Sequence, residues 1–392
     1  MDTIFWGASV YDTDSRTFIP RNVVVRDGSI LAVTDDCSAY PDAERIDCSG
    51  LYLIPGLVDV HTHGRVGLDF TGASTGDATK DSEKLDQVML SYARTGTTSV
   101  MVTLASAPID SWIETAAFLA DYAHSEHKGA NIPGLHLEGN FLSFIRRGAH
   151  AADLLCAPSA DVLDRIADLS KGLCLHASIA PELDGSDAFL KEALRRGVSV
   201  GIAHSDATFE QAVEAVRKGA NSFTHTFNAM SPLHHRMPGC VGAALLTDEA
   251  YAELICDGFH SHPATACLLK RTKPADKLIL ITDSMEAAGL SDGEYSIAGI
   301  PVFVKNGQAV NSEGAIAGST ISLFDGLCNF MRFTGTSLED AIPAATANPA
   351  RMIGAYEQIG SVAAGKRADF LLVENKDAPV LKSVICGGVT IE

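Results

Sequence analysis

The sequence predicts an α/β protein: a (β/α)8 TIM-like barrel with a small β-sandwich domain built from both ends of the chain. Three observations predict this fold. Short apolar runs alternate with helical patterns through the middle of the chain, polar side chains follow the apolar runs, and both ends are rich in strand-forming residues. The composition is 46% apolar and 20% charged, which excludes a largely disordered chain.

The two ends of the chain share the same strand-like character. Residues 4–11 and 23–33 are rich in β-branched and aromatic side chains, and Asp27-Gly28 predicts a tight hairpin turn. Similar runs return in the last thirty residues. Two strand-rich ends flanking a different middle indicate one sheet domain made from both termini. We expect that domain to take residues 1–53 and 356–392, and the barrel residues 54–355.

The middle of the chain holds eight short apolar runs of the kind that forms parallel strands buried on both faces. They are residues 57–63, 99–104, 135–138, 173–179, 198–204, 222–225, 252–257 and 278–283. Helical spacing is clearest at residues 82–94, 111–123 and 189–196, and Thr208 with Gln211 fits a capping box. Eight strands alternating with helices match a (β/α)8 barrel, which needs about 250 residues.

Charge and cysteine content narrow the function and the compartment. The 30 Lys and Arg against 49 Asp and Glu give a net charge of −19, which argues against binding to nucleic acid or an anionic membrane. No apolar run of about 18 residues could span a bilayer, and no signal peptide is evident at the first residues. The nine cysteines are scattered without a C-x-x-C pair, so we expect a cytoplasmic protein.

Potential metal ligands follow the apolar runs, at the strand ends where barrels of this kind carry their chemistry. They are His61, His63, Glu138, His204, His225 and Asp283. Because residues i and i+2 of a strand share a face, His61 and His63 point the same way, with Asp59 behind them. A single strand-end histidine could simply bond a carbonyl, and Asp283 alone could cap the following segment. Their joint occurrence favours a divalent transition metal such as zinc.

Several motifs resemble those of a known family. Residues 55–64, PGLVDVHTHG, look like the first-strand motif of the amidohydrolase superfamily. The later motifs are similar to those of the N-acetylglucosamine-6-phosphate deacetylases within it. They lie at residues 134–139, 203–205, 224–230, 234–239, 257–260 and 281–283. The resemblance covers essentially the whole chain, and its later motifs are specific to these deacetylases.

The resemblance implies a role for each ligand. Glu138, His204 and His225 would hold the principal metal, and His61 with His63 could hold a second ion beside it. The expected cofactor is therefore zinc, at one or two ions per subunit. Asp283 would be the general base, which takes a proton from water and passes it to the leaving amine.

The resemblance also implies a substrate site. The residues are His150, Asn228, Ala229, Arg236 and His260. His260 would touch the substrate carbonyl, while Asn228 and the backbone near Ala229 would hold the sugar phosphate end with His150 nearby. Arg236 would bind the substrate phosphate, and in a homodimer it would reach the site from the neighbouring subunit. One departure stands out: Asn140 follows Glu138-Gly139 where the family usually has proline, which leaves sugar selectivity open.

The implied activity is metal-dependent hydrolysis of the N-acetyl amide of N-acetyl-D-glucosamine 6-phosphate to glucosamine 6-phosphate and acetate, in amino-sugar catabolism. A deacetylase for the galactosamine epimer stays open, because the two sugars differ at one hydroxyl. A cyclic-amide hydrolase of the dihydroorotase or hydantoinase type is the other enzyme alternative. Those enzymes typically carry a modified lysine at strand four, and residues 177–179 contain none. A metal-free scaffold that has lost catalysis is an alternative from a different class. Such a protein would be expected to have lost metal ligands, and this sequence retains the full set.

Overall fold

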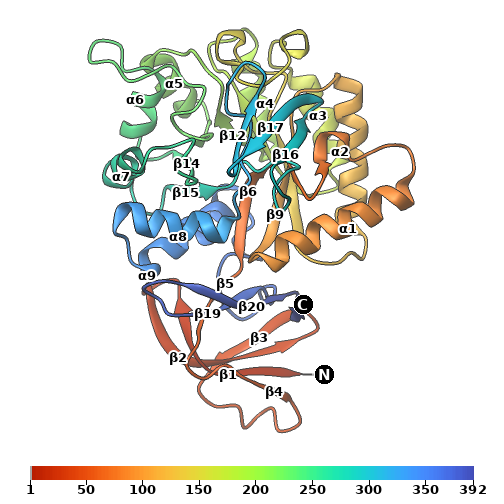
Figure 1. Ribbon diagram of the computed structural model, residues 1–392, viewed down its shortest axis with the longest axis vertical. Coiled ribbons are helices and arrows are strands. Elements are labelled where there is room, and N and C mark those ends of the chain that lie inside the picture. The colour runs from red at the N-terminus through yellow and green to blue at the C-terminus, as the bar shows by residue number, and fades with distance from the viewer. Residues whose placement is uncertain (1) are drawn as a thin grey trace.

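The computed structural model describes residues 2–392. The chain forms two units, a strand-rich domain below and a helix-covered barrel above, and the first and last strands both lie in the lower unit (Figure 1). Within residues 2–392, no helix combines the length and the apolar character needed to cross a membrane. The predicted α/β barrel with a second, strand-rich domain is confirmed.

The strand-rich domain is one hydrogen-bonded sheet assembled from both ends of the chain. Its strands are β1 (Thr3–Asp12), β2 (Thr17–Arg26), β3 (Ser29–Thr34), β4 (Glu44–Asp47), β5 (Tyr52–Pro55), β19 (Phe370–Glu374), β20 (Val380–Cys386) and β21 (Val389–Ile391). They follow the order β21-β20-β19-β5-β1-β2-β3, with β4 beside β1. Asp27 and Gly28 both take positive φ, 48° and 76°, as the predicted two-residue hairpin requires.

This domain has an apolar core of its own. Phe5 from the first strand packs edge-to-face on Phe370 near the other end of the chain, with ring centroids 4.8 Å apart. Since only Gly56 separates β5 from the first barrel strand, the sheet anchors the start of the barrel. The proposed domain boundaries stay residues 1–53, 54–355 and 356–392, with the sheet itself running on through Ile54 and Pro55 at the end of β5.

Eight parallel strands form the barrel and pair in chain order. They are β6 (Leu57–Thr62), β9 (Thr97–Leu104), β10 (Asn131–Leu137), β11 (Cys174–Ile179), β12 (Ser199–Ile202), β13 (Ser222–Phe223), β14 (Tyr251–Ile255) and β15 (Leu278–Ile281). Each overlaps one of the eight predicted runs. A minor strand pair, β7 (Gly64–Arg65) and β8 (Leu68–Asp69), follows the first barrel strand.

Helices surround the barrel strands. They are α1 (Ala78–Arg94), α2 (Ile109–His124), α3 (Ala160–Leu169), α4 (Ser186–Arg196), α5 (Phe209–Arg217), α6 (Gly239–Leu246), α7 (Pro263–Thr272), α8 (Leu323–Thr334), α9 (Leu338–Ala341) and α10 (Ala347–Met352), with 3-10 turns at Phe70–Gly72, Phe144–Arg146, Ala152–Leu154 and Ile342–Ala345. The capping box at Thr208 is present. The Thr208 hydroxyl accepts from the Gln211 backbone N–H at 3.2 Å, and the Thr208 backbone N–H donates to Oε1 of Gln211 at 2.9 Å. Sequence periodicity did not predict α6, because nearly all of its residues are buried and no polar stripe marks a face.

Asp59 helps to close the barrel between its last and first strands. This fully buried carboxylate accepts from the Thr282 hydroxyl at 2.5 Å, from the Thr282 N–H at 3.3 Å and from the His61 N–H at 3.3 Å. The Asp283 N–H also donates to the His61 carbonyl at 2.9 Å. The seam therefore lies directly under the side chains expected to bind metal.

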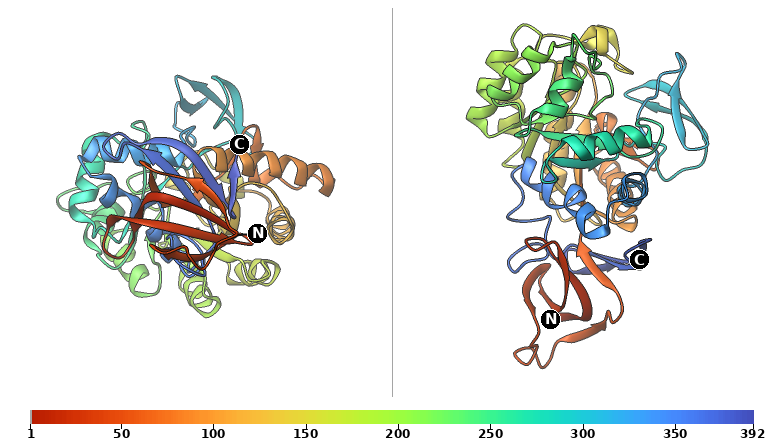
Figure 2. Two further views of the ribbon diagram at one scale, coloured as in Figure 1. Left: turned by 90° about the horizontal axis from the view of Figure 1, so that it is seen from below. Right: turned by 90° about the vertical axis from the view of Figure 1, so that its left-hand side faces the viewer.

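The sequence analysis did not predict a small antiparallel sheet. Strands β16 (Gly293–Ile297), β17 (Ile300–Lys305) and β18 (Gln308–Asn311) follow the last barrel strand and stand out from the barrel in the right-hand view of Figure 2. The Ala298 N–H in its first turn donates to Asp69 at 2.6 Å. The run 300–305, rich in β-branched and aromatic residues, stands before Asn306-Gly307 and is a hairpin signal that could have identified this sheet.

Replacing Thr282 with valine is expected to lower the free energy of unfolding by about 2 kcal/mol, because Asp59 loses a donor inside the closed barrel. Urea-induced unfolding measures the change. The matched control is Thr272→Val, since the partly exposed Thr272 hydroxyl bonds carbonyls of its own helix. The control should stay within about 0.5 kcal/mol of the wild type. Equal losses in both variants would contradict a role for Asp59 in closure.

Candidate metal centre and active site

Three predicted ligands lie two residues beyond the ends of their strands. His204, His225 and Asp283 follow β12, β13 and β15, with left-handed φ of 42°, 30° and 49°. The expected strands ran to the ligands themselves, so their ends were placed too late. Positive φ is costly for a side chain with a Cβ, and such positions gather at functional sites. Here the strained residues turn the chain just beyond the strand ends, and their side chains reach one cluster.

One group of ligands gathers on Oε1 of Glu138. This oxygen lies 2.8 Å from Nε2 of His225 and 3.5 Å from Nε2 of His204. The two ring nitrogens are 3.1 Å apart. His204 is oriented by its Nδ1, which donates to the Arg146 carbonyl at 2.8 Å, so its Nε2 keeps a lone pair facing Glu138 and His225.

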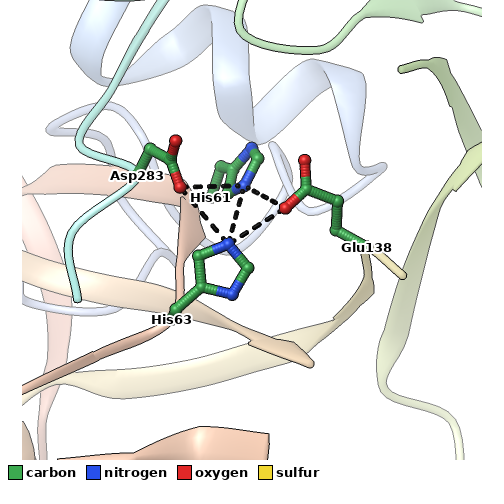
Figure 3. Close-up of side chains that lie close together, drawn as sticks. All are labelled: His61, His63, Glu138 and Asp283. Carbon is green, nitrogen blue, oxygen red and sulfur yellow. Dashed lines mark hydrogen bonds and ion pairs between the residues drawn. The ribbon is translucent and has the colours of Figure 1, made fainter. Parts of the chain in front are cut away.

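The second group gathers on the other oxygen of the same carboxylate. Oε2 of Glu138 lies 3.1 Å from Nε2 of His61 and 3.0 Å from Nε2 of His63. Asp283 closes the group, with Oδ1 at 3.4 Å and 3.3 Å from the same two nitrogens. Figure 3 shows the four side chains turned toward one another. Glu138 therefore bridges two clusters, and the structure brings all six predicted ligands together.

Burial and charge shape the protonation of this centre. Burial opposes a charge on His63, but hydrogen bonds to Asp283 and Glu138 and the charges on both carboxylates raise its pKa to about 9. Burial also opposes a charge on His61, yet the charge of Glu138 raises its pKa well above the ordinary value. Despite burial, His61 in turn holds the pKa of Glu138 and of Asp283 below their ordinary values. Two ionised carboxylates thus demand compensating positive charge.

The donor set fits a divalent cation. Within residues 2–392, each group offers ligand atoms that all lie within 4.8 Å of one another. In each group two ring nitrogens face each other, at 3.1 Å and 3.4 Å. A cation between them would remove the repulsion between their lone pairs. Imidazole nitrogen and carboxylate oxygen are the ligands that transition metals of the zinc type accept.

Glu253 contacts two of the clustered histidines, and the sequence analysis did not predict this role. This fully buried side chain of β14 lies with Oε2 at 3.3 Å from Nδ1 of His61 and accepts from the His225 N–H at 3.2 Å. Its contact leaves the opposite nitrogen of His61 for the cluster. The sequence signal that could have identified Glu253 is its charge, the only one in the run 251–255. A strand without a functional role would rarely bury such a charge.

Four of the five predicted substrate residues line one cavity beside the cluster. Its volume is about 430 Å³, and His150, Asn228, Ala229 and His260 are among its lining residues. Asn228 donates to the His225 carbonyl at 3.1 Å. His260 is oriented by Asp257, whose Oδ2 lies 2.7 Å from its Nδ1. The cavity opens onto Glu138 and Asp283.

Arg236 does not line this cavity in its own chain. It lies on an exposed loop, with Nη1 at 2.9 Å from Nε2 of His235. Leu233 and Met237 beside it are 54% and 70% exposed. The single chain therefore leaves this predicted phosphate ligand outside the site.

Asn140 takes a backbone conformation closed to proline. Its φ is 43°, whereas a proline ring fixes φ near −65°. Its side chain accepts from the Ala107 N–H at 3.1 Å and donates to the Ala107 carbonyl at 2.8 Å. The departure noted in the sequence thus ties the loop after β10 to the loop after β9.

Comparison with known proteins agrees with this geometry. Residues 52–391 match the amidohydrolase family. The chain is 33% identical over 371 residues to N-acetylglucosamine-6-phosphate deacetylase of Bacillus subtilis, covering 94% of this chain and 92% of the relative. It is also 33% identical over 327 residues to N-acetylgalactosamine-6-phosphate deacetylase of Escherichia coli O157:H7, covering 82% and 84%.

Solved structures give the same answer. N-acetylglucosamine-6-phosphate deacetylase from Pasteurella multocida superposes with a TM-score of 0.90 at 26% identity, covering 100% of this chain and 99% of the other. A mutant of the Mycobacterium smegmatis enzyme, in complex with N-acetyl-D-glucosamine-6-phosphate, gives 0.88 at 28% identity and the same coverage. The family expected from the motifs is thereby confirmed: the chain belongs to the amidohydrolase family.

Proposed function

We propose that this chain hydrolyses the N-acetyl amide of N-acetyl-D-glucosamine 6-phosphate, releasing acetate and glucosamine 6-phosphate. The observation that carries the proposal is the buried Glu138 carboxylate, which bridges two histidine groups beside Asp283 at the floor of one cavity. The matched relatives named as deacetylases support the choice of substrate.

The metal would be held by Glu138, His204 and His225, with His61 and His63 able to hold a second ion. We propose zinc, at one or two ions per subunit. A bound ion of this type supplies positive charge that polarises a carbonyl and lowers the pKa of a nearby water. That charge would take the place of the protons that the two carboxylates otherwise draw onto the histidines.

Asp283 would act as the general base. Its lowered pKa keeps it ionised at neutral pH, so it can accept a proton from the attacking water. It would then give this proton to the amide nitrogen as the carbon–nitrogen bond breaks. His260, held by Asp257, would donate to the carbonyl oxygen as negative charge develops there.

The cavity wall would hold the sugar phosphate. Within residues 2–392 no group accepts from the Ala229 N–H, which leaves a main-chain donor for the ligand. Asn228 and His150 line the same wall and would add side-chain contacts.

Arg236 would complete the phosphate site across a homodimer interface. The exposed apolar side chains of Leu233 and Met237 on the same loop support an interface there. A planar guanidinium also suits phosphate oxygens. We propose a cytoplasmic location, because all nine cysteines are free thiols.

Deacetylation of N-acetyl-D-galactosamine 6-phosphate is the second candidate, favoured by the 33% identity to an enzyme of that name. Cyclic-amide hydrolysis is less well supported, because β11 ends at Ala177-Ser178-Ile179 without a lysine.

The substitution Asp283→Asn should lower kcat by about 10³-fold, because the side chain can no longer accept a proton. Acetate release measures the rate, and elemental analysis should find the metal retained. The exposed Asp168→Asn, on α3, is the matched control and should keep full activity. A kcat near that of the wild type would remove Asp283 from the role of base.

Removal of metal by a chelator should abolish acetate release, and zinc should restore it where magnesium does not, because imidazole ligands favour zinc. The assay compares N-acetylglucosamine 6-phosphate, its galactosamine epimer and dihydroorotate on the same preparations. Turnover that survives complete chelation, or that is fastest on dihydroorotate, would refute the proposed function.

Mixing two defective variants tests whether Arg236 acts across the interface. Arg236→Ala should raise KM about tenfold or more for the phosphorylated substrate and little for the dephosphorylated analogue. A hybrid dimer of Arg236→Ala with Asp283→Asn subunits should regain one intact site and normal KM. Hybrids that keep the high KM would place Arg236 in the site of its own chain.

A further inference from the structure

Ser106 is one of the residues that line the cavity, and its hydroxyl lies between two partners. Its hydroxyl oxygen accepts from the Asn140 N–H at 3.1 Å and lies 2.9 Å from Nδ1 of His150. The side chain is buried, with 3% of its surface exposed. Among the residues the structure describes, no acceptor other than His150 stands within hydrogen-bonding distance of this hydroxyl.

The position of the Asn140 N–H is firmly set. Asn140 has a left-handed φ of 43°, and the two bonds between its side chain and the Ala107 backbone hold the two loops together. The donor that meets Ser106 is therefore part of a doubly tied junction.

Counting hydrogens decides the direction of the bond between Ser106 and His150. A hydroxyl has one hydrogen to donate and two lone pairs. One lone pair takes the Asn140 N–H, so the hydroxyl hydrogen satisfies a partner only if it points at Nδ1 of His150. In the reverse direction this nearly buried hydrogen would have no acceptor among the described residues, which is costly. A neutral imidazole that accepts at Nδ1 carries its proton on Nε2.

We propose that Ser106, held by the Asn140 N–H, is a positioning residue that keeps His150 in the Nε2–H tautomer. The cavity wall then offers a donor at this point instead of a lone pair.

The consequence concerns what the cavity can bind. No residue in the described range bonds Nε2 of His150, and the side chain lines the cavity. Its ring packs edge-to-face on His204, with centroids 4.7 Å apart at 89°, so it cannot swing away freely. A fixed N–H here favours ligand oxygens, such as those of a hydroxyl, carbonyl or phosphate. The identity of that ligand rests on the proposed function, whereas the tautomer does not.

Nitrogen NMR on zinc-loaded protein labelled with ¹⁵N-histidine reads the tautomer directly, and His150→Gln assigns the signals. In the wild type Nδ1 should be unprotonated and Nε2 protonated. Ser106→Ala should shift the Nδ1 resonance and add a population protonated at Nδ1, while Ser106→Thr, which keeps the hydroxyl, should restore the wild-type signals. A wild-type proton on Nδ1, or unchanged signals in Ser106→Ala, would overturn the proposal.

Kinetics supply the second readout. Ser106→Ala should raise KM about tenfold with kcat changed less than about threefold, as expected when a ligand contact common to ground and transition states is lost. Ser170→Ala, an equally buried serine bonded to the Ala167 carbonyl, should leave both constants unchanged. An unchanged KM in Ser106→Ala would overturn the link to binding. If the wild type lacks the deacetylase activity, the tautomer measurement still decides the proposal.

Discussion

The centre depends on one buried carboxylate that serves two sets of imidazoles. Each oxygen of Glu138 faces a pair of histidine nitrogens at 2.8–3.5 Å, and Asp283 adds a second negative charge to one pair. Two carboxylates this deep in a barrel are stable only with compensating positive charge. The need for that charge explains both the raised pKa of His61 and His63 and the fit of the site to a divalent cation.

Local backbone strain and several buried polar contacts hold this arrangement. Residues with left-handed φ follow three of the strands, and their side chains meet at the carboxyl end of the barrel. Asp59 links the last strand to the first beneath them. Glu253 touches His61 on one side and the His225 backbone on the other. The rigid barrel thus orients the ligands, while loops supply the cavity wall.

Parts of the structure that follow from short-range pattern were predictable. Apolar runs located all eight barrel strands. The polar residues that follow them include the six side chains that meet in the cluster, because the carboxyl ends of parallel strands lie at one face of the barrel. Patterning failed for α6, whose residues are buried almost all round, and strand ends were misplaced where a ligand such as His204 turns the backbone. Glu253 and the bond from Ser106 to His150 are long-range contacts that no local spacing reveals. Arg236 lies outside the cavity of its own chain, and local spacing does not reveal that position.

Anomalous X-ray diffraction at the zinc edge, from crystals of the zinc-loaded protein, tests whether Glu138 binds the metal. A peak should appear within coordination distance of Glu138, His204 and His225, and any second peak should lie near the other oxygen of Glu138, close to His61 and His63. Zinc bound elsewhere, with no peak in contact with Glu138, would contradict that prediction.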